Sequence, residues 1–258
     1  MSTTGPILRR GNKRPQVVFS DDHRTRTIGR QVESEAGRDG SLGFMVTPNM
    51  SIRKAVGSLG KEGGRLFFTE GVWMFDGSIA IDTPNIHFFS TSPGRTVFKR
   101  PATSSTTASM LTFSGDGAIV EGIRFIDKVS GASAAITCSG TRGTVKNCVF
   151  EDVVKGITVS GNWCAIRDCD FLVVDQTTNE RVVEFTGSAS NGLVLGNMFQ
   201  ELGGTVYLGD SVSNTAVLYN VFDNAVSGDT RISYFASKEI VTGSALNVVH
   251  ANQVEERS

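Results

Sequence analysis

Three acidic residues form the densest group of side chains in this chain that could act on a substrate. Asp127 stands two positions after one phenylalanine, and Glu151 and Asp152 directly follow another. Cleavage of a glycosidic bond uses two carboxyl groups, about 5 to 5.5 Å apart for retention of configuration and about 6.5 to 9.5 Å for inversion. If the two segments stack, Asp127 and Asp152 become neighbours at the shorter spacing. All three acids are therefore candidate catalytic residues for the enzyme alternative, and a solvated turn neutralised by Lys128 and Lys155 explains them without chemistry.

A second type of glycan cleavage, by a polysaccharide lyase, is less well supported. A lyase needs a base that removes a proton from a uronate, and usually Ca²⁺ held by clustered carboxylates. The basic residues expected to project outward are Lys146 and Arg167, below Glu121, and a ladder of charges on a solvated face explains them. The three histidines, at positions 23, 87 and 250, are far apart in the sequence. We therefore predict no metal site and no cofactor.

Trp163 is the candidate residue for binding a glycan without cleaving it. It follows Gly161 and Asn162 at a predicted turn, where an indole ring can stack on a sugar. Trp73, in contrast, is expected in the core near the start of the fold. A glycan-binding module centred on Trp163 thus stands beside the two enzyme hypotheses.

A repeat between Leu111 and Phe222 must position these candidates. Its first block is apolar-x-apolar followed by Ser, Thr or Gly, and its second block ends on Phe. The first block begins at Leu111, Ile136, Ile157, Val183 and Val206, and the second ends at Phe125, Phe150, Phe171, Phe199 and Phe222. A degenerate sixth copy closes the chain at 249–254. Self-similarity at a period of 20 to 50 residues is the signature of a solenoid.

The content of the repeat predicts which solenoid it is. Each segment has four to six residues of alternating β-branched and aromatic side chains, bounded by Gly, Ser, Asn or Asp, and no copy has a helical pattern. Short strands stacked on their counterparts in the next turn make a parallel β-helix. One column is expected to form an internal ladder at a bend, with rungs about 4.8 Å apart. That column contains Ile123, Cys148, Cys169, Asn197, Asn220 and Asn252. The four cysteines, at 138, 148, 164 and 169, are predicted to be reduced core thiols.

Residues 1–46 differ in character from the rest and are predicted to be an extended basic arm. Through position 30 there are seven Lys and Arg against two Asp, and no signal-peptide pattern is present. A flexible tail and an arm that orders on a partner protein both fit this composition. The residues assigned to attachment are Arg9, Arg10, Lys13, Arg14, Val17, Val18 and Phe19. Thr47 is the expected N-cap of a short helix, roughly 50–59, that closes the open end of the coil.

The segment after this helix resembles a known family. The helix 52–59, the pair Gly63-Gly64, and segments 65–68 and 70–75 resemble the opening of the pectate-lyase-like superfamily, and 85–90 with 96–99 resembles its next rung. The resemblance covers roughly residues 50 to 254. It implies an all-β, single-stranded right-handed parallel β-helix of about seven rungs over residues 47–258. The superfamily includes pectate lyases, polygalacturonases, sugar epimerases and trimeric bacteriophage tailspikes. Its Asp-rich calcium motif and its Arg-bearing lyase motif are not found in this sequence.

An apolar patch is predicted on the outside of the later rungs. If alternation holds, the outward side chains there are Leu195, Met198, Leu218 and Val221, which a lone monomer would leave exposed to water. The resemblance to phage spikes implies that such faces pack around a three-fold axis. These four residues are therefore the predicted interface of a homotrimer.

The function that these features favour is that of a non-catalytic structural protein of a bacteriophage virion. It would be a tailspike or fibre segment, or a decoration of the capsid or tail, assembled in the host cytoplasm and docked on other virion proteins by its arm. Host surface polysaccharide is a further expected partner. The net charge is −1 and no apolar run approaches 18 residues, so neither nucleic acid nor membrane insertion is expected. The alternative is a polysaccharide lyase or glycoside hydrolase that acts on host glycan.

Overall fold

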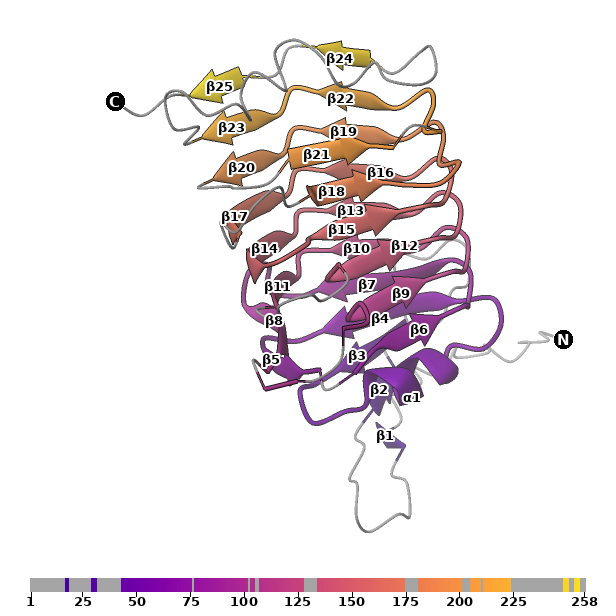
Figure 1. Ribbon diagram of the computed structural model, residues 1–258. Helices are drawn as coiled ribbons and strands as arrows, with labels where there is room; N and C mark the ends of the chain where they lie inside the picture. The colour runs from indigo at the N-terminus through magenta and orange to yellow at the C-terminus, as the bar shows by residue number, and fades with distance from the viewer. Residues whose placement is uncertain are drawn as a thin grey trace, which may run out of the picture.

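The computed structural model describes residues 17–18, 29–31, 43–75, 77–101, 103–104, 107–127, 134–174, 181–200, 205–209, 211–223, 248–250 and 253–255. Short strands stack in rungs along one axis and form three sheets, here named A, B and C (Figure 1). All pairings within sheets B and C are parallel, and sheet A is parallel from β3 onward. The predicted right-handed parallel β-helix is confirmed.

The strands of each sheet are consecutive rungs of the same wall. Sheet A contains, in spatial order, β1 (Val17–Val18), β2 (Gly29–Gln31), β3 (Gly43–Val46), β4 (Gly64–Phe68), β7 (Ile86–Ser90), β10 (Ile119–Glu121), β13 (Thr144–Lys146), β16 (Ala165–Arg167), β19 (Leu193–Leu195), β22 (Ala216–Leu218) and β24 (Val248–His250). Sheet B contains β25 (Gln253–Glu255), β23 (Val221–Asp223), β20 (Met198–Gln200), β17 (Asp170–Val174), β14 (Val149–Val153), β11 (Arg124–Asp127), β8 (Thr96–Arg100) and β5 (Gly71–Met74). Sheet C contains β21 (Thr205–Leu208), β18 (Arg181–Phe185), β15 (Ile157–Val159), β12 (Ile136–Cys138), β9 (Leu111–Phe113) and β6 (Ile79–Ile81).

The number of rungs is close to the prediction. Sheet C has six strands among the described residues, so six turns contain a strand of every sheet, compared with about seven predicted. Sheets A and B continue beyond them through β22 to β25. The degenerate last copy is in register with the repeat, because Val249 pairs with Val217 and Val254 with Phe222.

The interior of the coil is built from columns of identical or similar side chains. The phenylalanines that end the repeat stack face to face, with ring centroids 4.7 to 5.1 Å apart. The bend between sheets A and B holds the predicted ladder: Asn197 donates to the side-chain oxygen of Asn220 at 2.9 Å, and its own side-chain oxygen accepts from the Cys169 backbone N–H. All four cysteines are buried free thiols, as predicted. Asn252 lies outside the described residues.

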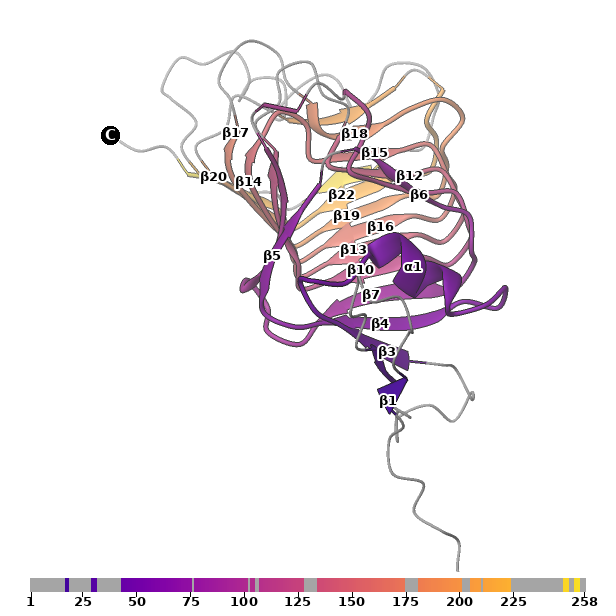
Figure 2. The same ribbon diagram turned by 90° about the horizontal axis from the view of Figure 1, so that it is seen from below.

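Helix α1 (Ile52–Gly57) closes the N-terminal end of the coil, as predicted (Figure 2). Its N-cap is Ser51, not Thr47: the Ser51 hydroxyl accepts from the Lys54 N–H, and the helix is therefore shorter than expected. Ile52, with Ala55, packs into the same core cluster as the first strands. No helix among the described residues is long and apolar enough to span a membrane.

The predicted boundary between arm and coil separates two strands that pair with each other. β3, which falls within the predicted arm, pairs in parallel with β4, so the coil begins at Gly43 in the structure rather than at Thr47. β1 and β2 extend sheet A with antiparallel pairings, and β1 consists of Val17 and Val18. The other attachment residues, Arg9, Arg10, Lys13, Arg14 and Phe19, lie outside the described residues.

Candidate functional site

Asp127 lies inside the coil and not on a solvated turn. β11 continues to this residue, so strand alternation turns the carboxylate inward, where its side chain is 2% exposed. One carboxylate oxygen lies 3.5 Å from the guanidinium of Arg100, its register partner in the preceding rung. Arg100 also donates to the carbonyl oxygen of Ala108 at 2.6 Å. A carboxylate buried in this way is part of the structure of the coil and does not contact a glycan in solvent.

The other two candidate acids lie elsewhere on β14. Glu151 is in register with Ile126, one position before Asp127, and therefore points outward. It accepts a hydrogen bond from the Arg124 guanidinium of the preceding rung. Asp152 is half-buried and has a left-handed backbone, with φ of 51°. The structure thus places Asp127 and Glu151 on opposite faces of sheet B and does not gather the three acids on one surface.

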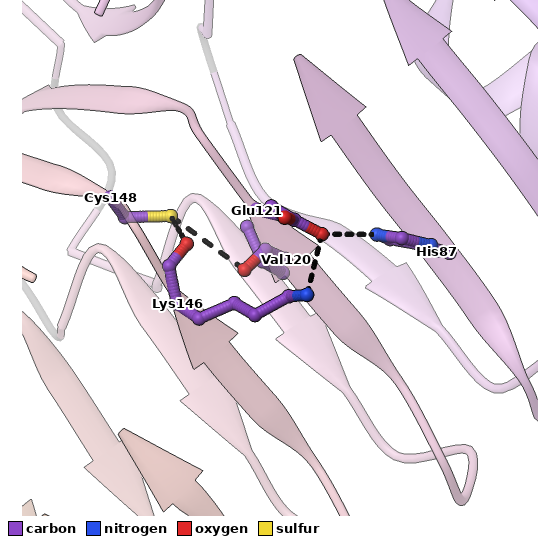
Figure 3. A network of polar contacts seen from close by, with 5 residues as sticks. All are labelled: His87, Val120, Glu121, Lys146 and Cys148. Carbon is purple, nitrogen blue, oxygen red and sulfur yellow. Dashed lines mark hydrogen bonds and ion pairs between the residues drawn. The ribbon is translucent and has the colours of Figure 1, made fainter. Parts of the chain in front are cut away.

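A network of polar side chains crosses the outer face of sheet A, where the charge ladder was expected (Figure 3). His87 Nε2 lies 3.2 Å from Glu121 Oε2, and Lys146 Nζ lies 2.8 Å from the same oxygen. The three residues belong to β7, β10 and β13, which are consecutive rungs of the sheet. Behind them, the Cys148 thiol donates to the carbonyl oxygens of Lys146 and Val120 and ties the network to the bend.

The charges of this network are fixed near neutral pH. Burial lowers the pKa of His87, and the charge and hydrogen bond of Glu121 oppose this effect without reversing it. Burial raises the pKa of Glu121, but its hydrogen bond with Lys146, the Lys146 charge and the contact with His87 outweigh burial, so its pKa lies below the ordinary value. The network therefore contains a carboxylate–ammonium pair beside a neutral imidazole.

The outer face of sheet C carries a second ordered array, which consists mainly of hydroxyl groups. Three successive rungs present threonine at the same register position: Thr112 pairs with Thr137, and Thr137 pairs with Thr158. The column continues through Glu184 to Tyr207. Register pairing sets a spacing of about 4.8 Å between successive side chains.

A parallel column of hydroxyls lies two residues further along each strand. It contains Ser114, Ser139, Ser160 and Thr186. The three serines are exposed, and Ser139 donates to the carbonyl oxygen of Phe113 in the preceding rung at 3.2 Å. We call these two columns together the hydroxyl face; its members are Thr112, Ser114, Thr137, Ser139, Thr158, Ser160, Glu184, Thr186 and Tyr207.

One ion pair lies in the hydroxyl face. The Lys155 ammonium lies 2.7 Å from the Glu184 carboxylate, whose side chain is 7% exposed. The register neighbours of Glu184 are Thr158 and Tyr207, and neither is an acid. Thr137, two rungs below, exchanges a hydrogen bond with Ser109 at 2.7 Å. The described part of the face therefore offers hydroxyl donors and acceptors with one neutralised carboxylate.

Trp163 lies at the corner next to this face. It follows Ser160 in the turn from β15 to β16, and its side chain is 63% exposed. The corner is held rigidly, because the side-chain oxygen of Asn162 accepts from both the backbone N–H and the hydroxyl of Ser190 in the next rung. A large exposed ring on a fixed corner is the geometry that stacks on a sugar. Among the described residues, no group of three His, Cys, Asp or Glu could hold a metal ion.

The four residues of the predicted interface all point outward and are half-buried. Leu195 and Leu218 are register partners on sheet A, and Met198 and Val221 are register partners on sheet B. The two pairs thus lie on either side of the bend between these sheets. The homotrimer itself stays a prediction.

No protein-family model and no curated protein matches the sequence. Among solved structures, the catalytic domain of a GH87 alpha-1,3-glucanase has a TM-score of 0.57 at 13% identity, covering 81% of this chain and 45% of that chain. A PL6 family alginate lyase has a TM-score of 0.50 at 14% identity, covering 82% and 35%. The chain shares the fold of these enzymes. It spans less than half of their length, and at this identity the similarity extends to the fold alone.

A bacteriophage protein is also among the similar structures. ORF18 of Geobacillus virus E2 has a TM-score of 0.40 at 12% identity, covering 80% of this chain and 56% of that one. That similarity is too low to carry a conclusion. The β-helix predicted from the repeat therefore rests on the rung register and on the two enzyme structures.

Proposed function

We propose that this protein is a non-catalytic β-helical protein that binds a polysaccharide along the hydroxyl face of sheet C. The observation that carries the proposal is the regular double column of hydroxyls. Its spacing of about 4.8 Å per rung is close to the repeat of an extended sugar chain, so successive residues of a glycan can meet equivalent groups. Trp163 adds a stacking surface at the edge of the same face.

Binding without cleavage fits the chemistry of this face. Glycoside hydrolysis needs two carboxyl groups at defined separations. In the described part of the hydroxyl face Glu184 has hydroxyl-bearing register neighbours and is paired with Lys155. A face that is nearly uncharged favours a neutral glycan over an anionic one, because an anionic chain would lose hydration without gaining cationic partners.

Within this proposal, the protein acts in a bacteriophage particle, where the coil contacts host surface polysaccharide. The support comes from the sequence: a basic segment that suits docking on other virion proteins precedes the coil. The alternative, a glycoside hydrolase or polysaccharide lyase, has support of its own. Two of the similar structures, an alpha-1,3-glucanase and an alginate lyase, have TM-scores of 0.57 and 0.50.

Titration calorimetry with purified oligosaccharides tests the proposal. The first probes are alpha-1,3-glucan oligosaccharides, which are neutral, and alginate oligosaccharides, which are anionic. Thr137→Val and Thr158→Val remove one hydroxyl each at nearly constant volume, and each should weaken binding by about 3- to 10-fold, the value of one hydrogen bond. Thr144→Val is the matched control, because Thr144 points outward from sheet A.

Two further results decide between binding and cleavage. Trp163→Ala should also weaken binding, and wild-type protein should release no reducing ends from either probe. Release that is lost in Glu184→Gln or in Asp152→Asn would establish the enzyme alternative. Equal affinity of wild type, Thr137→Val, Thr158→Val and Trp163→Ala would exclude sheet C as the binding surface.

A further inference from the structure

The outer face of sheet A carries an ordered series of apolar and charged side chains along the coil axis. One outward column, which we call the central column, runs through eight consecutive rungs. Its members are Met45, Phe67, Phe89, Glu121, Lys146, Arg167, Leu195 and Leu218. Within these eight rungs the first three and the last two residues are apolar and the middle three are charged. The register continues to Arg30 beyond Met45 and to His250 beyond Leu218. The acidic residue and the basic residues are on opposite sides of the midpoint, which lies between β10 and β13.

Arg167 makes no ion pair within the part of its own chain that the structure describes. Its neighbours in the central column are Lys146, a like charge, and Leu195, an apolar side chain. It is exposed and makes no ion pair with any described residue. Lys146, in contrast, is paired with Glu121 at 2.8 Å. The column thus holds one cation, Arg167, that is not paired with any of the described residues.

Two copies could cover this face in a parallel or an antiparallel manner. In the parallel arrangement each rung meets the same rung of the other copy, so Lys146 and Arg167 come close to their own duplicates. In the antiparallel arrangement the coil axis is reversed, and the order of rungs is inverted. With a two-fold axis between β10 and β13, Glu121 of one copy lies opposite Lys146 of the other.

The rest of the central column is complementary in that register. Phe89 lies opposite Arg167 of the second copy, which suits a cation over an aromatic ring. Phe67 lies opposite Leu195, and Met45 lies opposite Leu218, so apolar groups meet apolar groups. No like charges face each other at any of these positions.

The second outward column of sheet A brings no like charges together in the same register. It contains Gly43, Arg65, His87, Ile119, Thr144, Ala165, Leu193 and Ala216. Inversion about the same axis places Arg65 opposite Leu193, His87 opposite Ala165, Ile119 opposite Thr144 and Gly43 opposite Ala216. No like charges meet at these four positions, and the bulky His87 meets the small Ala165, which suits two sheets packed about 10 Å apart.

We propose that the outer face of sheet A is the contact surface of an antiparallel two-fold dimer of this chain. A closed isologous contact of this kind buries the apolar ends of the central column and gives Arg167 an aromatic partner. It uses Leu195 and Leu218 of the predicted interface in a two-fold and not a three-fold assembly. Sheet C remains free, so the dimer does not depend on glycan binding.

Light scattering on complementary charge variants tests the proposal with the full chain. Wild type should have twice the 27.6 kDa chain mass. Glu121→Lys and Lys146→Glu should each be monomeric, because each puts like charges opposite each other at both symmetry-related contacts. An equimolar mixture of the two variants should form a heterodimer, because position 121 of each copy then faces an opposite charge at position 146 of the other.

The mixture separates a contact between chains from a contact within one. If the Glu121–Lys146 pair only stabilises its own chain, mixing two defective variants restores nothing. Lys61→Glu, an exposed charge reversal outside both outward columns of sheet A, is the control and should remain dimeric. Circular dichroism checks that each variant is folded. A trimeric or monomeric wild type, dimeric single variants, or a mixture that stays monomeric would each overturn the proposal.

Discussion

At the scale of single residues, His87 is the group through which pH acts on the stability of sheet A. It stays neutral in the folded protein because burial lowers its pKa below 6.5, the ordinary value, in spite of the neighbouring Glu121. The unfolded chain therefore binds a proton more readily than the folded one as the pH falls below 6.5. By linkage, this contribution to the free energy of unfolding is complete above 6.5 and is lost progressively below it.

Replacing His87 by a side chain that does not titrate should remove this pH dependence. We expect His87→Gln to reduce the difference in unfolding free energy between about pH 7 and about pH 5. Glu121 does not contribute in this window, because its pKa lies below the ordinary value of 4.5. Denaturant unfolding at both pH values gives the comparison. A variant that loses as much stability on acidification as wild type would show that His87 is not the titrating group.

The buried residues also show what alternation can and cannot predict. The ladder at the bend was predictable, because Cys148, Cys169 and Asn197 occupy one column of the repeat. Asp127 was misread as a turn residue, because an acid after an aromatic residue looks like the end of a strand. The missing signal was Arg100, which is in register with Asp127 one rung earlier and neutralises it.

At the scale of elements, the corner between sheets C and A depends on glycine for close approach. A Cβ added at Gly161 would lie 1.9 Å from the carbonyl oxygen of Gly140, and one at Gly140 would lie 2.3 Å from that of Gly115. The three glycines follow the serines of the hydroxyl face in successive rungs. Because glycine has no Cβ, the rungs can stack at their normal spacing at this corner. That spacing in turn sets the distance between the hydroxyls of successive rungs.

A single methyl group at this corner should therefore be costly. We expect Gly161→Ala to lower the free energy of unfolding by about 1 to 3 kcal/mol, as overpacking does. Gly57→Ala is the matched control: no atom lies within 4 Å of its added Cβ, and alanine favours the helix. Denaturant unfolding of both variants measures the difference. Equal stability of Gly161→Ala and wild type would mean that the corner relaxes freely.

The strands were predictable from the sequence because the repeat aligns them. Once two copies are written in register, inward and outward positions follow from alternation, and the structure confirms them for Phe125 and Phe150. The short helix was predictable in place but not in its first residue, since Thr47 and Ser51 are both good caps. Packing of Ile52 into the core decides in favour of Ser51.

At the scale of the whole molecule, the candidate sites are faces of the coil and not clusters of catalytic groups. Thr112, Thr137 and Thr158 occupy one position of the repeat and could have been found from the sequence as an outward column. The ion pair of Glu184 could not be found in this way, because its partner Lys155 lies in a segment of variable length between copies of the repeat. The charge of a face therefore depends on residues in the segments between the repeats, which the pattern of the repeat does not predict.

The ends of the coil set a further requirement on the whole molecule, which α1 meets at the N-terminal end. In a solenoid each rung is stabilised by its neighbours, so an uncapped first rung exposes apolar side chains along one side. Ile52 is 5% exposed and packs with the first rungs. We expect Ile52→Asp to lower the free energy of unfolding by about 3 kcal/mol or more, because it buries an unpaired carboxylate.

The same change should also expose the end of the core, and this separates capping from ordinary loss of stability. A dye that fluoresces on apolar surface should bind Ile52→Asp under conditions where the protein is still folded by circular dichroism. Lys54→Asp puts an acid on the exposed side of the same helix and should behave as wild type in both assays. If Ile52→Asp were less stable yet bound no dye, the first rung would be closed by its strands alone, and α1 would contribute only its packing energy.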